Sequence, residues 1–136
     1  MNMQYFEDAG ELLELFGIDT DKPGAQDFAC IADMVALMLR YDSYRCTVAD
    51  LAAVQMRTRK LSPKVFWSRM KRTLRPLIEA EAETLKALGI PAPGEPGRTC
   101  PHLAHQVGEA LASTIPIDAD SAEIAARVAR ACGRAK

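Results

Sequence analysis

The segment from Leu51 to Ile78 concentrates positive charge. It holds eight of the chain's 17 lysines and arginines and no aspartate or glutamate, so nine cations and all 18 acids lie elsewhere. Lys and Arg side chains neutralise phosphates, and arginine can also bridge the edge of a guanine with paired donors. The segment is therefore suited to binding a polyanion, while the acidic remainder of the chain limits non-specific attachment. The eight cations are Arg57, Arg59, Lys60, Lys64, Arg69, Lys71, Arg72 and Arg75.

Two helices predicted from the sequence must position these cations. Thr47 is a suitable cap for the first, with Asp50 at its third position, and Ser62 followed by Pro63 can start the second, which is expected to run from 63 to about 75. The apolar stripe of the second helix consists of Phe66, Met70, Leu74 and Leu77. A helix, a turn and a basic amphipathic helix follow one another in a helix-turn-helix. The intervening "RTRKLSP" predicts a connection longer than the usual roughly three or four residues.

In such a motif the second helix would read DNA. Arg69, Arg72 and Arg75 are three residues apart, which keeps them near one side of a short helix. Pro76 cannot donate an amide to the carbonyl of Arg72, so a kink or break is expected there, and Arg69 and Arg72 are the stronger candidates for base contacts. Phosphate contacts are expected from cations in and around the turn. The predicted DNA-binding residues are Arg69, Arg72, Arg75, Ser68, Lys71, Lys64, Arg57, Arg59 and Lys60.

The same basic surface also suits a second function class. An adaptor that binds an acidic protein surface would use the cations of the 57–75 segment for charge complementarity. Trp67, at the border of the apolar stripe, could then serve as an anchor. A helical fold by itself does not decide between DNA and protein as the partner.

Other site chemistries have weaker signatures. "CPHLAH" places Cys100, His102 and His105 close enough in sequence to hold zinc, but no second ligand pair accompanies them, so structural histidines are expected and no metal or cofactor is predicted. The acids Glu79, Glu81 and Glu83 are expected to lie around a helix and to face solvent. There is no glycine-rich phosphate loop, no GxSxG and no HExxH, so the sequence does not predict an enzyme.

The elements around the basic segment are also predicted to be helices. The chain is 49% hydrophobic, is poor in aromatic residues and lacks long alternating β-branched runs, which favours an all-α bundle of about six or seven helices. A single domain is expected over 1–132, with the helix-turn-helix at about 47–76 and a frayed tail at 133–136. Besides the two helices above, the pattern predicts helices at about 4–16, 25–41, 101–113 and 121–132, a helical run after Pro76 and a loop at 90–98.

Several cellular classes are excluded by the sequence pattern. The longest apolar segment, "FACIADMVALML", is interrupted by Asp33 and is too short to span a bilayer, so no membrane partner is expected. The acidic start of the chain is unlike a secretory signal, which begins basic and then becomes apolar. A cytoplasmic protein is therefore predicted, and its four cysteines are expected to be reduced and mostly buried.

Three stretches resemble the DNA-binding effector domain of the sporulation-initiation response regulator. "LFGIDTDKPGAQDFACIADMV" is similar to the start of that domain, where two glycines seven positions apart precede a helix with Met-Val. "SRMKRTLRPLIEA" is similar to its recognition helix, with the pattern Ser-Arg-apolar-x-Arg-x-apolar-Arg, and "PHLAHQVGEALA" resembles its last helix. In the first stretch the residues that match the family pattern are Gly17, Ile18, Gly24, Met34 and Val35. In the second stretch they are Ser68, Arg69, Met70, Arg72, Leu74 and Arg75.

The resemblance covers roughly 11–113, in patches, and has clear implications. It implies an all-helical fold of about six helices with a helix-turn-helix, and binding of double-stranded DNA as a homodimer or as tandem, head-to-tail copies. It also implies that Arg69, Arg72 and Arg75 contact bases or phosphates. This chain departs from the family at Lys71, where the family has an acid, and at Pro76, where it has a histidine. The segment before Glu11 is too short for the regulator's phosphoacceptor domain, so phosphorylation control is not implied.

Overall fold

The computed structural model of the protein describes residues 4–41, 46–90, 99–114 and 121–131. Every regular element in these ranges is an α-helix, which confirms the all-α prediction. The predicted frayed tail at 133–136 and most of the predicted loop at 90–98 lie outside the described residues. The helices are α1 (Gln4–Leu15), α2 (Pro23–Tyr41), α3 (Val48–Arg59), α4 (Pro63–Thr73), α5 (Arg75–Ile78), α6 (Ala82–Ala87), α7 (Cys100–Thr114) and α8 (Ser121–Ala131).

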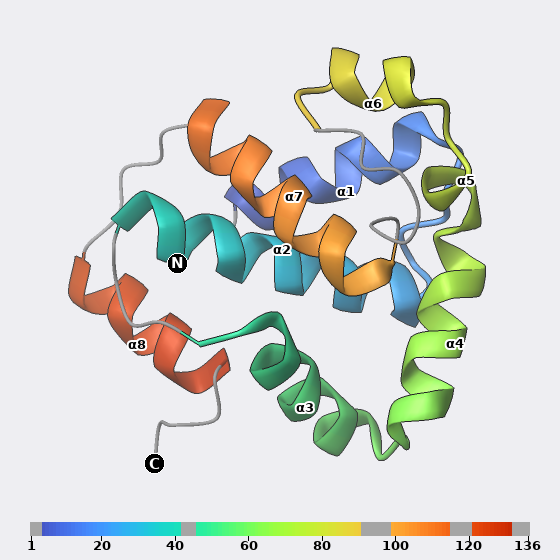
Figure 1. The fold of residues 1–136 in the computed structure, drawn as a ribbon. Helices are drawn as coiled ribbons and strands as arrows, with labels where there is room; N and C mark the ends of the chain where they lie inside the picture. Colours follow the sequence, from blue (N-terminus) through green and yellow to red (C-terminus); the bar gives the residue numbers. More distant parts are fainter. Residues whose placement is uncertain (1–3, 42–45, 91–98, 115–120, 132–136) are drawn as a thin grey trace.

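Helix α2 forms the centre of the molecule. It contacts α1, α3, α4, α7 and α8, which surround it (Figure 1). Its residues from Ile31 to Met38 are all buried, as expected for a helix that is apolar on nearly every side. Two of its buried residues are nevertheless acidic, Asp27 and Asp33.

Two glycines allow neighbouring helices to approach α2 closely. A Cβ atom at Gly24 would lie 2.8 Å from Thr73 Oγ1 and 3.2 Å from Met70 Cα, so the start of α2 touches the backbone of α4. A Cβ atom at Gly108 in α7 would lie 2.6 Å from the side chain of Val35. Because no larger side chain fits without movement, these two positions fix how closely α4 and α7 pack on the central helix.

The predicted caps around the basic segment are confirmed. The Thr47 hydroxyl accepts a hydrogen bond from the Asp50 amide at 3.1 Å, and the Asp50 carboxylate accepts one from the Thr47 amide at 3.0 Å, forming a capping box. The Ser62 hydroxyl caps α4 by accepting from the Val65 amide at 3.3 Å, with Pro63 in the first turn. Both helices of the basic segment therefore begin where local sequence signals place them.

The prediction of a long connection between these helices is wrong. Helix α3 continues to Arg59, and only the three residues 60–62 separate it from α4. Lys60 ends α3 in the left-handed region (φ 58°, ψ 47°), and the Leu61 amide donates to the Met56 carbonyl at 3.0 Å. The run "RTRK" is made mostly of good helix formers, and a left-handed cap then reverses the chain within three residues.

The predicted break near Pro76 is confirmed, but the helical run after it is interrupted once more. Helix α4 ends at Thr73, and the short α5 begins at Arg75 with Pro76 in its first turn. The run predicted after Pro76 is divided into α5 and α6 by residues 79–81. Leu77 and Leu85 are both fully buried, so packing against the core outweighs the helix propensity of the intervening Ala and Glu residues. This division accounts for the number of described helices exceeding the prediction.

The cysteines differ in their states. Cys30 is half-buried and Cys100 is buried, and both are free thiols. Cys46 is disulfide-bonded, so the expectation that all four cysteines are reduced is wrong at this position. Cys46 lies one residue before the cap of α3. Among the described helices, none combines the length and the apolar character needed to cross a membrane.

Candidate nucleic-acid interface

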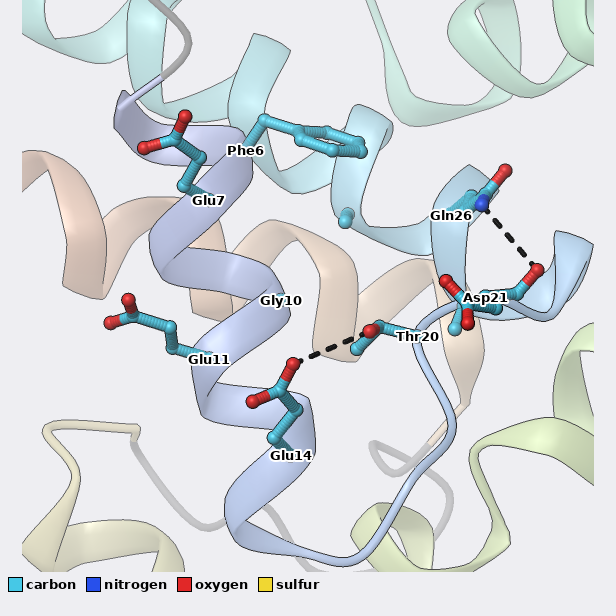
Figure 2. A pocket seen from close by; sticks show the side chains of 10 residues that line it. Phe6, Glu7, Gly10, Glu11, Glu14, Thr20, Asp21 and Gln26 are labelled. Atoms are coloured by element: carbon cyan, nitrogen blue, oxygen red, sulfur yellow. Dashed lines mark hydrogen bonds between the residues drawn. The ribbon is translucent and has the colours of Figure 1, made fainter.

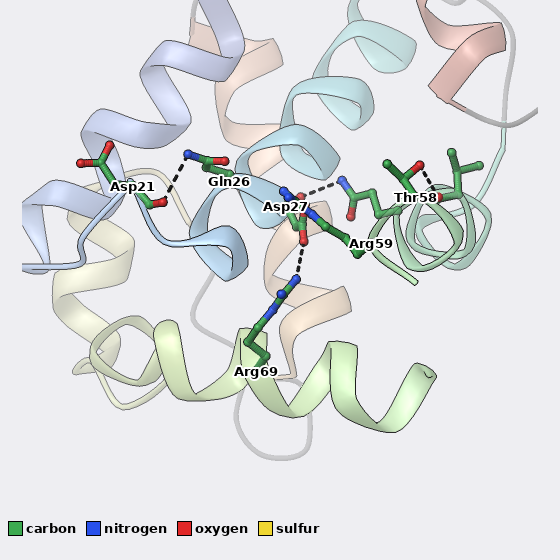
Figure 3. Close-up of polar contacts among 8 residues, drawn as sticks. Asp21, Gln26, Asp27, Thr58, Arg59 and Arg69 are labelled. Carbon is green, nitrogen blue, oxygen red and sulfur yellow. Dashed lines mark hydrogen bonds and ion pairs between the residues drawn. The ribbon is translucent and has the colours of Figure 1, made fainter. Parts of the chain in front are cut away.

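The predicted DNA-binding residues lie on the end of α3, the connection, α4 and the start of α5. Figure 3 views α3 along its axis while α4 lies across the picture, so the two helices are crossed. Seven of the eight cations are exposed, and within the described residues six of these seven form no ion pair. We call these six the basic face: Arg57, Lys60, Lys64, Lys71, Arg72 and Arg75.

The other two cations of the segment are held by one buried carboxylate. Asp27 in α2 is 4% exposed. The Arg59 guanidinium donates from Nη2 and Nε to Asp27 Oδ1 at 2.9 and 3.2 Å, and Arg69 Nη2 donates to Asp27 Oδ2 at 3.0 Å. Figure 3 shows the two arginines reaching Asp27 from α3 and α4. Asp27 thus ties both helices of the basic segment to the central helix.

A further polar contact supports this arrangement. The Gln55 side-chain amide, also from α3, donates to the Asp27 backbone carbonyl at 3.1 Å. Asp27 therefore accepts hydrogen bonds through its side chain and its backbone. Sequence reasoning missed this residue because it lies 32 and 42 positions before its arginine partners. The available signal was an acidic residue on an otherwise apolar helix, which must be paired if it is buried.

Arg69 therefore has a structural partner that the sequence did not reveal. The exposed fraction of its side chain is 27%, and its Nε atom is buried. A guanidinium bound to a buried carboxylate is held in one direction and presents fewer free donors to a ligand. Arg59, whose side chain is 36% exposed, is engaged at the same carboxylate.

The outer side of α4 carries the exposed polar residues at helical spacing. Lys64, Ser68 and Lys71 are four and three residues apart, so they follow one another along one side of the helix, and all three are exposed. Arg72 is exposed next to this line. Phe66 and Met70 are buried on the inner side, as the apolar stripe predicted.

Arg75 differs from the other cations of the basic face. It is the first residue of α5, beyond the helix end at Leu74, and its carbonyl accepts the Glu79 amide at 2.9 Å. Its side chain is exposed. The spacing of three that places Arg69, Arg72 and Arg75 on one side of a helix therefore does not apply to the last of them.

The proposed anchor Trp67 is half-buried and packs against the core. Its ring lies edge-on to Phe66, with centroids 5.1 Å apart and planes at 84°. Val65, one turn into α4, is by contrast 49% exposed. Val65 is thus the exposed apolar side chain among the cations of α4.

The residues of "CPHLAH" belong to the first turns of α7. Cys100 is buried, and burial raises the pKa of its thiol to about 11, although the nearby charge of Lys71 lowers it. His105 is exposed and its Nδ1 lies 2.6 Å from Glu109 Oε1, one turn further along. Among the described residues, His, Cys, Asp and Glu side chains form no group of three or more that could hold a metal ion.

A second buried acid anchors the last described helix. Asp33 in α2 is 1% exposed and binds Arg127 of α8 through Oδ2, while its Oδ1 atom has no hydrogen-bond partner among the residues that the structure describes. Burial raises the pKa of Asp33 to about 6, more than the charge and hydrogen bond of Arg127 lower it. The two buried acids of α2 therefore pair with arginines from three of the surrounding helices.

Acidic side chains gather along α1, away from the basic face. A groove of about 310 Å³ between α1 and the start of α2 is lined by Glu7, Glu11, Glu14 and Asp21, with Phe6 on the same surface (Figure 2). Glu14 accepts a hydrogen bond from the Thr20 hydroxyl at 3.4 Å across this groove. In Figures 1 and 3, α2 lies between α1 and α3, so the acidic groove is separated from the end of α3 that bears part of the basic face.

Comparisons with protein-family models, with curated proteins and with solved structures find no match for the chain. The resemblance to the sporulation regulator's effector domain stays a prediction for that reason.

Proposed function

We propose that the protein binds double-stranded DNA through the basic face and acts as a transcription regulator, with α3 and α4 working as a helix-turn-helix. The observation that carries this proposal is the basic face itself: six exposed cations on one segment that contains no acid. The three-residue connection and the crossed arrangement of α3 and α4 also support it.

Helix α4 has suitable dimensions and chemistry for the major groove. Its 11 residues span about 16 Å, and a major groove about 12 Å wide admits one α-helix. Lys64, Ser68 and Lys71 would face the DNA, with Arg72 beside them. Arg72 is the best candidate for reading a guanine, since its guanidinium is exposed and in the described structure has no carboxylate partner.

The remaining cations would serve other purposes. Arg57 and Lys60, at the end of α3 and in the connection, would contact phosphates and set the register of the protein on the duplex. Arg59 and Arg69 would act indirectly, because their pairing with Asp27 holds α3 and α4 in place. In this proposal Arg69 is a positioning residue and not a base-reading one.

The direct test is the affinity for duplexes recovered by selection from random DNA, measured by fluorescence anisotropy. We expect Arg72→Ala to weaken binding to a selected site by about 1–3 kcal/mol, with an unchanged circular dichroism spectrum. The matched control is Lys86→Ala, which removes an exposed cation from α6, outside the basic face. Absence of wild-type binding to any duplex at low salt, or equal losses for both variants, would contradict the proposal.

A protein-binding adaptor is the second candidate, and the exposed Val65 favours it. An apolar side chain among cations is more useful against an acidic protein surface than against phosphates. Val65→Ser and Lys64→Ala separate the two functions. Non-specific DNA binding should fall only in Lys64→Ala, whereas an apolar anchor in a protein interface should make Val65→Ser the more damaging change.

A further inference from the structure

The start of α2 and the end of α4 enclose a depression of about 370 Å³ next to the basic face. Three cations line it, together with a hydroxyl group and two small or rigid residues, and none of the lining residues is acidic. The lining residues are Lys22, Pro23, Gly24, Arg69, Arg72 and Thr73.

The depression combines groups from two elements far apart in sequence. Lys22 precedes the first turn of α2 and is exposed, while Arg72 and Thr73 belong to the last turn of α4. The glycine at 24 leaves the wall without a side chain, and a Cβ there would meet Thr73 Oγ1 at 2.8 Å. Gly24 is buried and the Thr73 hydroxyl donates to the Arg69 carbonyl at 3.1 Å, so the exposed polar groups of the depression are the side chains of Lys22 and Arg72.

This composition suits a compact oxyanion. The Lys22 ammonium and the Arg72 guanidinium, which line the depression from two different elements, provide positive charge and several donors. The Arg69 guanidinium adds positive charge at the inner end, although Asp27 offsets part of that charge. The positive end of α2 strengthens the same field.

We propose that this depression binds a phosphate group of the DNA backbone, with Lys22, the residue before α2, as a phosphate contact. The inference rests on the proposed function, because the phosphate belongs to the same duplex that α4 would enter. Lys22 lies outside the basic segment, so the interface extends across the helix pair onto the central helix. Arg72 would lie between this phosphate and the bases. Its contact with a base would therefore depend on where the depression holds the DNA backbone.

The experiment measures how the affinity for duplex DNA depends on salt concentration. A cation that neutralises one phosphate contributes about 0.9 to the slope of log affinity against log salt. We expect Lys22→Ala to lower the slope magnitude by about 1, and to weaken binding by a similar factor for duplexes of different sequence. Lys22→Arg should keep the wild-type slope, and Lys86→Ala should leave it unchanged. Equal slopes for Lys22→Ala and the wild type would overturn the phosphate site while leaving the DNA-binding proposal intact.

A second measurement keeps the site testable if the wild type does not bind DNA. Inorganic phosphate is titrated into ¹⁵N-labelled protein at constant ionic strength, with chloride as the reference anion. Saturable shifts of the Gly24 and Thr73 amide signals that disappear in Lys22→Ala would support the phosphate site and reject DNA as its source. Equal responses in the wild type and Lys22→Ala, or no response in either, would overturn the site.

Discussion

At Asp27, a single buried carboxylate holds arginines from two helices. An ion pair of this kind contributes to stability only while both partners are present, because the desolvated charge left behind is costly. The exposed fractions of the two arginine side chains, 36% and 27%, reduce this cost, since water can solvate them when the carboxylate is neutralised. The main effect of Asp27 is therefore to position α3 and α4, and its contribution to the free energy of unfolding is the smaller effect.

Asp27→Asn should lower the free energy of unfolding by about 1–3 kcal/mol. The amide keeps the size of the side chain but cannot balance two guanidinium groups. Urea denaturation measures the change, and Asp21→Asn is the control because Asp21 is exposed. The role of Asp27 would be refuted if the two variants were equally stable.

At the scale of helices, α7 approaches α2 closely at Gly108. The nearest atoms to a Cβ placed there include the carbonyl oxygen of Ala32 at 2.9 Å, which belongs to the backbone of α2 and cannot swing away. A larger residue would push the two helices apart and disturb the core on both sides of the contact.

Gly108→Ala should destabilise the protein by about 1–3 kcal/mol, despite the better helix propensity of alanine. Gly10→Ala is the matched control, because a Cβ at Gly10 in α1 would meet only Thr20 Cγ2, at 4.0 Å. That variant should be neutral or more stable by up to about 1 kcal/mol. The two midpoints of chemical denaturation give the comparison, and a Gly108→Ala protein as stable as the Gly10→Ala protein would refute the close contact.

Sequence reasoning predicted the helices and caps but not the pairs between them. Thr47, Ser62 and Pro76 act on residues within one turn, so their effects could be read from neighbours in the sequence. The pairing of Asp27 with Arg59 and Arg69 depends on how three helices pack, and no local pattern records that. For the same reason the cations of the basic face could be named from the sequence, but not which of them are exposed. The length of the connection was misjudged because the left-handed turn at Lys60 has no glycine to mark it.

At the scale of the whole molecule, α8 is joined to the core through Asp33 and Arg127. Burial raises the pKa of Asp33 to about 6 in spite of the paired arginine. The folded chain therefore holds a proton on Asp33 more readily than the unfolded chain, in which the pKa is near 3.8. Ionising this buried group therefore lowers the stability of the whole folded state relative to the unfolded chain.

The stability contributed by Asp33 should fall as the pH rises from about 4 to about 6. Between these values the folded state binds more protons than the unfolded state, so the slope is negative, at most about 1.4 kcal/mol per pH unit. Other carboxylates add their own pH dependence, so the measured quantity is the stability of Asp33→Asn minus that of the wild type. This difference should shift in favour of the variant through the window, and a difference independent of pH would refute the raised pKa.

The acidic groove on α1 has a consequence for how the molecule would approach a polyanion such as DNA. Negative charge on one side of α2 and positive charge on the other make the protein an electric dipole, although its net charge is only −1. In the field of a polyanion such a dipole experiences a torque that turns the basic face toward the strand before contact. In the proposed complex with DNA, this arrangement would speed productive encounters more than it would tighten binding, and the advantage would fade as salt shortens the range of the field.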